Sequence, residues 1–184
     1  FLLHVGSFDK RKDLITLVKA FKLLKEDRKN KHLKLVLAGQ KILNGNAEVL
    51  KELERYILTN NLSKSILMTG YLSGVEICSL YKKALIYVFP SIEEGFGIPV
   101  LEAFAMKTPV VTSNAAAMVE IAEGAAQHYN KGDYTELFKT LTKLIISKPK
   151  RNHLIEKGSE RLKAFSREKF IKDYEQFILN SVTN

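Results

Sequence analysis

The chain has 184 residues, of which 46% are hydrophobic, and a single cysteine, Cys78. This composition predicts one well-cored domain or half of a larger protein, and the lone cysteine excludes an internal disulfide framework. No apolar run approaches the roughly 20 residues that a membrane-spanning helix needs. Residues 1–5 are strand-like and carry no leader pattern, so we expect the chain to be a piece of a longer polypeptide.

The formal net charge is +9, from 29 Lys and Arg against 20 Asp and Glu. A basic balance favours anionic partners, such as nucleotides, phosphates, nucleic acid or an anionic membrane surface. A lysine-rich solvated surface is the alternative explanation.

Short apolar runs alternate with segments of helical periodicity along the whole chain. Strands are predicted at residues 2–5, 33–39, 65–69, 84–89, 109–112 and 124–129. Helices are predicted at residues 14–24, 49–57, 73–81, 98–106, 118–122, 137–145, 154–165 and 170–178. Asp13 is placed to cap the first of these helices, and the helix at 137–145 is expected to end near Pro149.

This alternation predicts an α/β fold, a Rossmann-like doubly wound parallel sheet with helices on both faces in three layers, α/β/α. Ligands bind such sheets at the carboxyl ends of the strands. The loops of unusual composition all follow predicted strands: residues 6–13, 39–46, 70–73, 91–97 and 113–117.

The stretch 93–103, EEGFGIPVLEA, joins a glycine-flanked polar loop to an apolar helix. Gly95 and Gly97 permit close backbone approach and positive φ, and Pro99 suits a first helical turn. A helix that begins here directs free N–H groups and a positive dipole end at the loop, which favours an anion.

Lys10, Arg11 and Lys12 lie beside the start of the first predicted helix. These three cations are interpreted either as a clamp for a diphosphate or as a solvated run of charges. The loop lacks both the G-x-G-x-x-G spacing and the P-loop motif, which argues against a dinucleotide oxidoreductase and a P-loop enzyme.

Glu102 is the single carboxylate in an otherwise apolar helix, so we expect it to be buried and paired. Its partner is either a ligand hydroxyl pair, such as a ribose diol, or backbone N–H groups of the helix start. Glu94 can bind a polyol or stabilise a developing cation, with Glu93 as the competing candidate.

The four histidines form no metal-ligand spacing, and no metal site is predicted. His4 lies in a predicted strand and is expected to be a satisfied core residue. The chain has no G-x-S-x-G elbow, and neither a recognition helix nor an aromatic platform for nucleic acid, so no nucleic acid partner is expected.

Residues 94–103 resemble the E-x7-E signature of retaining glycosyltransferases of family four with the GT-B fold. Residues 5–14, VGSFDKRKDL, resemble the first loop of that family, and the likeness continues in order along nearly the whole chain. Further family-like segments are residues 37–39, 89–91, 108–114 and 119–126.

The resemblance implies the C-terminal, donor-binding half of a two-domain enzyme. It assigns residues 1–165 to a nucleotide-sugar-binding domain and 166–184 to a helix that crosses toward an N-terminal acceptor domain of the same chain. It implies Glu94 as the catalytic residue at the donor sugar. The implied donor-binding residues are Gly6, Ser7, Arg11, Lys12, Gly39, Tyr71, Leu72, Gly95, Phe96, Gly97, Ile98 and Glu102.

The implied function is a retaining, metal-independent hexosyltransferase of polysaccharide or glycolipid synthesis, with no cofactor beyond its nucleotide-sugar substrate. The implied donors are GDP-mannose, UDP-glucose or UDP-N-acetylglucosamine, and the implied acceptor is a glycan or a lipid-linked sugar. The implied location is cytoplasmic, with peripheral attachment at the inner membrane surface as an option. The alternatives are a binding module without transfer activity, or another GT-B enzyme such as a sugar-nucleotide epimerase.

Three positions depart from the family pattern. Ser7 stands where many members have Arg, which shifts the expected diphosphate contacts to Arg11 and Lys12. Lys107 stands where many have Gly. Asp13 replaces a frequent Gly or Asn, which fits the expected capping role.

Overall fold

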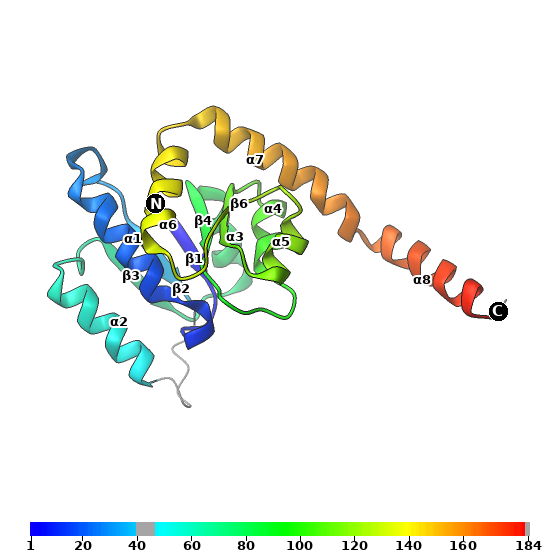
Figure 1. Cartoon of the computed structure of the whole chain (residues 1–184), viewed down its shortest axis with the longest axis horizontal. Helices are drawn as coiled ribbons and strands as arrows, with labels where there is room; N and C mark the ends of the chain where they lie inside the picture. The colour runs from blue at the N-terminus through cyan, green and yellow to red at the C-terminus, as the bar shows by residue number, and fades with distance from the viewer. Residues whose placement is uncertain (40–46, 183–184) are drawn as a thin grey trace.

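The computed structural model of the chain describes residues 1–39 and 47–182. Within these residues, six parallel strands form one sheet in the order β3-β2-β1-β4-β5-β6 (Figure 1). The strands are β1 (Leu2–Val5), β2 (Leu35–Ala38), β3 (Ile66–Gly70), β4 (Ile86–Phe89), β5 (Val110–Ser113) and β6 (Gln127–Tyr129). The doubly wound parallel sheet predicted from the alternating pattern is confirmed.

Helices connect successive strands and cover both faces of the sheet (Figure 1). The α-helices are α1 (Leu14–Glu26), α2 (Ala47–Thr59), α3 (Gly74–Lys83), α4 (Ile98–Ala105), α5 (Ala116–Ala122), α6 (Tyr134–Ile145), α7 (Lys148–Arg161) and α8 (Arg167–Val182). Short 3₁₀ turns lie at η1 (Lys10–Lys12), η2 (Arg28–Asn30) and η3 (Leu162–Phe165). None of the described helices is long and apolar enough to span a membrane.

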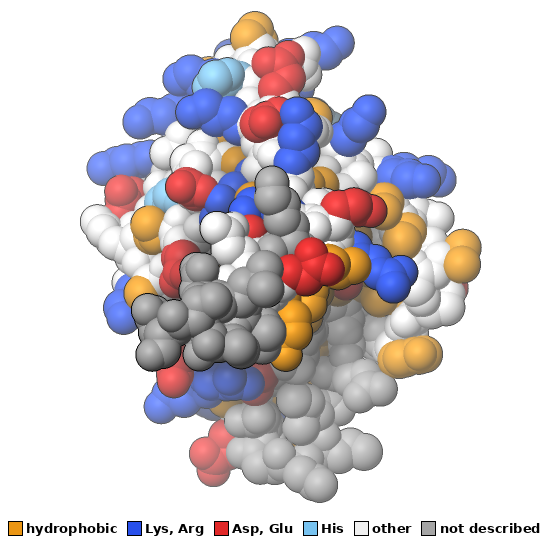
Figure 2. All heavy atoms as spheres, turned by 90° about the vertical axis from the view of Figure 1, so that its right-hand side faces the viewer, with side chains coloured by type: hydrophobic (Ala, Val, Ile, Leu, Met, Phe, Trp, Pro, Cys, Tyr) orange, Lys and Arg blue, Asp and Glu red, His pale blue; other side chains and the backbone are white. Residues whose placement is uncertain are grey.

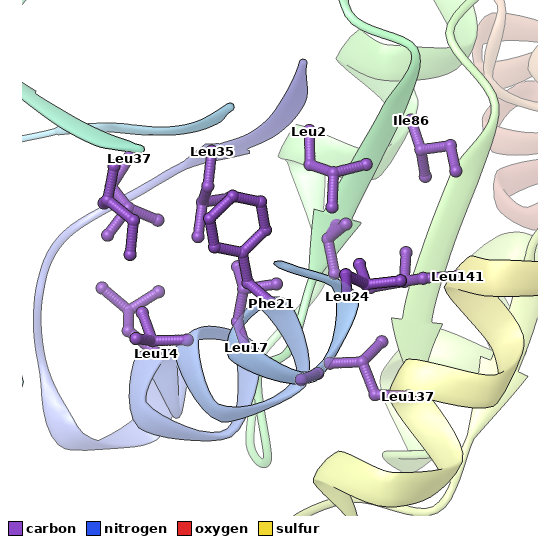
Figure 3. Packing of buried hydrophobic residues seen from close by; sticks show 14 of the residues in the cluster. Leu2, Leu14, Leu17, Phe21, Leu24, Leu35, Leu37, Ile86, Leu137 and Leu141 are labelled. Atoms are coloured by element: carbon purple, nitrogen blue, oxygen red, sulfur yellow. The ribbon is translucent and has the colours of Figure 1, made fainter. Parts of the chain in front are cut away.

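Alternate residues of the buried strands build two hydrophobic cores, because successive side chains of a strand point to opposite faces. Leu2 and Ile86 pack with Phe21 of α1 and Leu137 of α6 on one face (Figure 3). On the other face, Leu3 and Tyr87 pack with residues of α4 and α5. Strands covered on both sides read as continuous apolar runs, which is the pattern that predicted them.

Several predicted boundaries are wrong because turns and caps use the apolar residues at element ends. β2 begins at Leu35, since the Leu33 N–H donates to Asn30 in a turn. β4 begins at Ile86, since Ala84 caps α3. β6 begins at Gln127, after a turn through Gly124 with φ 78°.

Two helix ends also differ from the prediction. α6 ends at Ile145, and Pro149 lies in the first turn of α7, where its missing N–H costs nothing. α7 ends at Arg161, and residues 162–165 continue as the 3₁₀ turn η3. The chain then enters α8, which extends away from the sheet (Figure 1).

Asp13 occupies the predicted N-cap position of α1. Its backbone is in the left-handed region, with φ 44°, and its carbonyl oxygen accepts the Thr16 N–H at 3.1 Å. Asp13 is therefore the N-cap residue of α1 as predicted, but it forms no side-chain cap hydrogen bond. A left-handed backbone is tolerated best by Gly, Asn and Asp, which accounts for Asp at this position.

Candidate functional site

The site lies where the strand order reverses. From β1 the chain adds β2 and β3 on one side and β4, β5 and β6 on the other, so β1 and β4 are neighbours. The chain that leaves β1 leads to α1 on one face of the sheet, and the chain that leaves β4 leads to α4 on the other face. At such a switch point, sheets of this type bind ligands in a crevice beside the carboxyl ends of the strands. The loops that follow β1 and β4 are those that the sequence singled out, residues 6–13 and 91–97.

Three glycines bring the ends of β1, β2 and β3 into close contact. The Gly6 N–H donates to Ala38 at 2.9 Å, and the Gly39 N–H donates to Gly70 at 3.1 Å. A Cβ atom on Gly39 would lie 1.8 Å from the Gly6 carbonyl oxygen, so only glycine fits there. The floor of the crevice is therefore bare backbone, as close approach of a ligand requires.

Hydrogen bonds fasten the two loops of the crevice to each other. The Arg11 carbonyl oxygen accepts the Ile92 N–H at 2.8 Å and the Ser91 hydroxyl at 3.2 Å. The Ser91 carbonyl oxygen in turn accepts the Ser113 hydroxyl from the end of β5. Ser91 and Ser113 are buried, so the base of the site is preorganised by bonds that solvent does not reach.

Lys12 and Glu94 form an ion pair at the centre of the site. Their side chains are 11% and 12% exposed, and the Glu94 carboxylate also accepts the Ser91 hydroxyl. The Lys12 ammonium lies over the ring of Phe89, 4.8 Å from its centroid. The structure thus pairs the two residues that the resemblance assigns to diphosphate and sugar.

The rest of the basic run is not equivalent to Lys12. Lys10 is exposed, and the Arg11 guanidinium is 56% exposed and lies 3.5 Å from the carboxylate of Asp9. Asp9 also accepts the Ser7 hydroxyl at 2.6 Å and the Arg11 N–H at 3.0 Å. Ser7 therefore shapes the loop through Asp9, and Lys12 is the buried cation of the three.

The glycine-flanked loop presents its backbone and apolar side chains to solvent at the start of α4. Gly95 is exposed, and Phe96 and Ile98 are 53% and 60% exposed. Gly97 is the N-cap residue of α4, with φ 101°, and Pro99 lies in the first turn as predicted. The start of this helix leaves N–H groups and a positive dipole end available to an anion.

Glu102 is exposed, so the expectation that it is buried is wrong. The helix start does not satisfy it either: its carboxylate accepts the Tyr81 hydroxyl of α3 at 3.2 Å. Burial, followed by the nearby Glu102 charge, raises the pKa of Tyr81. An apolar helix can carry an open carboxylate because α4 packs Val100, Ala103 and Phe104 inward and leaves the Glu102 side toward α3 uncovered.

The remaining predicted donor-binding residues lie along the same edge of the sheet. Tyr71 is 75% exposed just after β3, and Leu72 is partly buried against the second core. Gly39 ends β2 beside Gly70, while the predicted loop 40–46 lies outside the described residues.

His4 is a core residue as expected, but only one of its two ring nitrogens has a hydrogen-bond partner within the described residues. Its Nδ1 lies 3.2 Å from the Val88 carbonyl oxygen, and its Nε2 has no hydrogen-bond partner within the described residues. Nε2 faces the backbone of Gly6, since a Cβ atom built there would lie 3.2 Å away. Desolvation, the largest cause, lowers the pKa of His4 to about 4, so the ring is neutral at pH 7.

Residue-type reasoning gave no role to Ser91, Asp9 or Tyr81. Each is an ordinary residue in sequence, and each holds a predicted site residue: Ser91 holds Glu94, Asp9 holds the loop of Arg11, and Tyr81 holds Glu102. The contact of Tyr81 with Glu102 joins α3 to α4, and no local pattern encodes it, whereas Ser91 bonds to Glu94 within the same loop. Among residues 1–39 and 47–182, no group of three or more His, Cys, Asp or Glu is arranged to hold a metal ion.

The comparisons with known proteins agree with this architecture. Residues 1–161 match the family described as glycosyl transferases group 1. The serotype-specific mannosyltransferase WbdA of Escherichia coli is 28% identical over 146 residues, which cover 79% of this chain but 17% of WbdA. The chain thus spans less than a fifth of that relative.

Two solved structures share the fold. The C-terminal domain of the group 1 glycosyltransferase LpcC from Francisella tularensis is 25% identical, with a TM-score of 0.78 over 89% of this chain and 84% of that domain. HepE from Anabaena, solved with UDP, is 19% identical, with a TM-score of 0.83 over 99% of this chain and 48% of HepE. This chain therefore has the fold of the C-terminal domain of a GT-B glycosyltransferase, and it belongs to the family of group 1 glycosyltransferases.

Proposed function

We propose that the chain binds the donor of a retaining glycosyltransferase, a nucleotide-diphosphate sugar, and works in polysaccharide or glycolipid synthesis. The observation that carries the proposal is the pairing of Lys12 with Glu94 at the switch point of the sheet, beside the start of α4. A cation for the diphosphate and a carboxylate for the sugar thus share one crevice. Family membership and the likeness to WbdA, named as a mannosyltransferase, support the same reading.

The charges assign a task to each side of the donor. Lys12, with Arg11 at the rim and the N–H groups that open α4, neutralises the diphosphate as it leaves. Glu94 contacts the sugar hydroxyls and stabilises the oxocarbenium-like transition state. Glu102 is open to solvent, so its carboxylate is free to accept the two hydroxyls of a ribose.

Donor binding requires Lys12 to change partners. In the structure its ammonium is paired with the Glu94 carboxylate. A diphosphate that takes this cation also releases the Glu94 carboxylate toward the sugar. In this proposal, binding of the diphosphate to Lys12 therefore also frees Glu94 to contact the sugar.

Protein groups alone neutralise the leaving group in this scheme, so we propose that transfer needs no metal ion or other cofactor. Transfer by the full-length enzyme is accordingly expected to continue in the presence of EDTA. We further propose a cytoplasmic enzyme that works beside the membrane, with an N-terminal domain of the same chain supplying a glycan or lipid-linked acceptor.

The direct test is the unfolding temperature of the chain with GDP-mannose, UDP-glucose and UDP-N-acetylglucosamine. A ligand at about a hundred times its Kd stabilises the fold by about 2.7 kcal/mol, which is a readily measured shift. One of the donors is expected to stabilise the wild type, Lys12→Ala is expected to abolish the shift, and the exposed control Lys10→Ala to retain it. Stabilisation by none of them, or equal shifts for Lys12→Ala, would contradict the donor-site proposal.

Detection of a glycoside product with the full-length enzyme separates transferase from the alternatives. A sugar-nucleotide epimerase would return an isomerised donor, and a binding module would return the donor unchanged.

A further inference from the structure

The positive charge of the chain is concentrated at one end of the fold. In a doubly wound sheet, all connections from a helix back to the next strand lie at the end where the strands begin. In this chain that end is opposite the crevice, toward the start of β1 and the α6–α7 turn (Figure 1). We call this end the basic pole, and it comprises residues 22–34, 58–65, 82–85, 105–109, 122–126 and 143–151.

The basic pole holds fourteen of the 29 Lys and Arg but three of the 20 Asp and Glu. Its net charge is therefore +11, and the rest of the chain carries −2, so the pole accounts for the whole positive balance. Eleven of the fourteen cations are exposed: Arg28, Lys29, Lys31, Lys34, Lys64, Lys82, Lys83, Lys107, Lys143, Lys148 and Lys150. Figure 2 shows Lys and Arg side chains over the upper part of the visible face.

Helix ends account for part of these cations: Lys25, Lys82, Lys83 and Lys143 lie in the last turns of α1, α3 and α6. The Arg151 guanidinium donates to the Leu144 and Ile145 carbonyl oxygens at the end of α6. Such positions complement the negative ends of helices. Lys148 and Lys150 lie in the first turn of α7, where the helix dipole gives a cation no such support, and both are exposed. Lys31 and Lys34 follow η2 and are also exposed, and the Lys34 ammonium donates to the Lys64 carbonyl oxygen at 2.6 Å.

Two large apolar side chains stand among these cations. Leu58 is 69% exposed and Ile146 is 79% exposed. Exposed apolar side chains on a lysine-rich surface suit an interface in which the apolar groups enter lipid and the ammonium groups meet phosphates. By contrast, the six connections contain no Phe, Tyr or Trp, the side chains that provide stacking platforms for single-stranded nucleic acid.

We propose that the basic pole is a docking surface for an anionic phospholipid bilayer. The pole spans the width of the sheet and matches a negative surface by charge. Its accessibility in the whole enzyme rests on the proposed function, because a second GT-B domain would face the crevice at the opposite end. A bilayer at the pole places the donor crevice away from the membrane, where it meets the outer end of a lipid-linked glycan.

Sedimentation of the chain with vesicles tests the proposal. The chain is expected to bind an equal mixture of phosphatidylglycerol and phosphatidylcholine at low ionic strength, and not phosphatidylcholine alone. Binding is expected to weaken as salt is added, because screening shortens the reach of the charges. No binding to the phosphatidylglycerol vesicles would overturn the proposal.

Two variants of equal net charge distinguish binding through the basic pole from attraction by the overall charge of the chain. The pole variant replaces Lys29, Lys31, Lys148 and Lys150 by Gln, and the control variant replaces the exposed Lys51, Lys131, Lys139 and Lys157 by Gln. Each lysine removed from the pole is expected to lower vesicle binding about fivefold, while the control stays within a fewfold of wild type. Equal losses in both variants would overturn the assignment of the pole.

Nucleic acid is the competing partner, because it carries negative charge as the bilayer does. A single-stranded oligonucleotide that binds the chain more tightly than the vesicles, and loses this binding in the pole variant, would replace the lipid assignment. The unfolding midpoint of each variant checks its fold. Donor binding is measured in a separate experiment. If vesicle binding fails, the donor-site proposal is unaffected. If donor binding fails, vesicle binding still tests the docking surface.

Discussion

Glu94 and Glu102 lie eight positions apart in sequence, but their carboxylates have very different surroundings. Glu94 is held by Lys12 and Ser91 with its side chain 12% exposed, whereas Glu102 is exposed and accepts one hydroxyl, that of Tyr81. The first carboxylate is fixed beside a cation, and the second is free to take a ligand. Their proposed roles at the sugar and at the ribose follow from this difference.

Glutamine at each position is expected to separate the two roles. Glu102→Gln removes a charged acceptor and is expected to weaken nucleotide binding about tenfold. Glu94→Gln in the full-length enzyme is expected to leave nucleotide binding within a fewfold and to slow transfer about a hundredfold. Titration calorimetry and turnover measure the two effects. Unchanged nucleotide affinity in Glu102→Gln, or undiminished turnover in Glu94→Gln, would contradict the division of labour.

His4 makes the stability of the fold depend on pH. The pKa of His4 is lowered from 6.5 to about 4 in the fold, mainly by desolvation. As pH falls below 6.5, the unfolded chain gains a proton that the folded chain does not bind until about pH 4. The free energy of unfolding should therefore fall by up to about 3 kcal/mol between these values.

The measurement is urea denaturation at several pH values between 4 and 7, with His4→Leu as the control. The variant should lose this part of the pH dependence. An NMR titration of the wild type offers a second reading, and protonation of His4 near pH 6.5 in the folded chain would contradict the expectation.

Among the elements, α1 and α4 begin at the switch point of the sheet. One residue beside each of these helices departs from the family pattern and has a left-handed backbone. Asp13 before α1 has φ 44°, and Lys107 after α4 has φ 56°. Many members carry Gly at the position of Lys107 and Gly or Asn at that of Asp13. The structure explains those preferences by backbone conformation.

Lys107→Gly is therefore expected to stabilise the chain. Glycine adopts positive φ without the clash of a Cβ atom, and the gain should exceed its greater entropy in the unfolded state by about 0.5–1 kcal/mol. Lys107→Ala keeps the Cβ atom and removes the same charge, so it is the matched control and should bring no gain. Equal midpoints of chemical denaturation for the two variants would show that the strain is absent.

At the scale of the whole molecule, the crevice arises from strand order. Loops 6–13 and 91–97 are about eighty residues apart in sequence, and they meet because β1 and β4 are neighbours in the sheet. The helix α8 lies outside this arrangement and packs against η3, with Phe170 and Tyr174 exposed. The division of the chain near residue 165 stays a prediction.

A chain that ends at Phe165 tests that division. We expect it to unfold cooperatively, with a free energy of unfolding within about 1 kcal/mol of the whole chain, because both cores lie within residues 1–165. Donor binding should also persist. A chain that ends at Ile145 is the contrasting control, since it loses α7 and the packing of Gly158 on Phe104. A non-cooperative transition in the first truncation would contradict the boundary.

The fold class and the sheet edge that carries the candidate site follow from local sequence patterns. Apolar runs, helical spacing and glycines are local patterns, and the right-handed parallel architecture follows from their alternation. Local pattern also drew attention to Glu94 and Glu102, while the family resemblance singled out Lys12 with Arg11. Local pattern failed at element ends, where turns and caps claim apolar residues, as at Ala84 and Leu33.

How the site residues are held depends mainly on contacts between distant parts of the chain. The pairing of Lys12 with Glu94 joins two loops, and the contact of Tyr81 with Glu102 joins α3 to α4. The bond from Ser91 to Glu94, by contrast, lies within one loop. Burial was misjudged for Glu102 because the exposure of one helical face depends on which neighbour covers it. The concentration of positive charge at one pole likewise became visible when the topology brought six separate connections to the same end of the sheet.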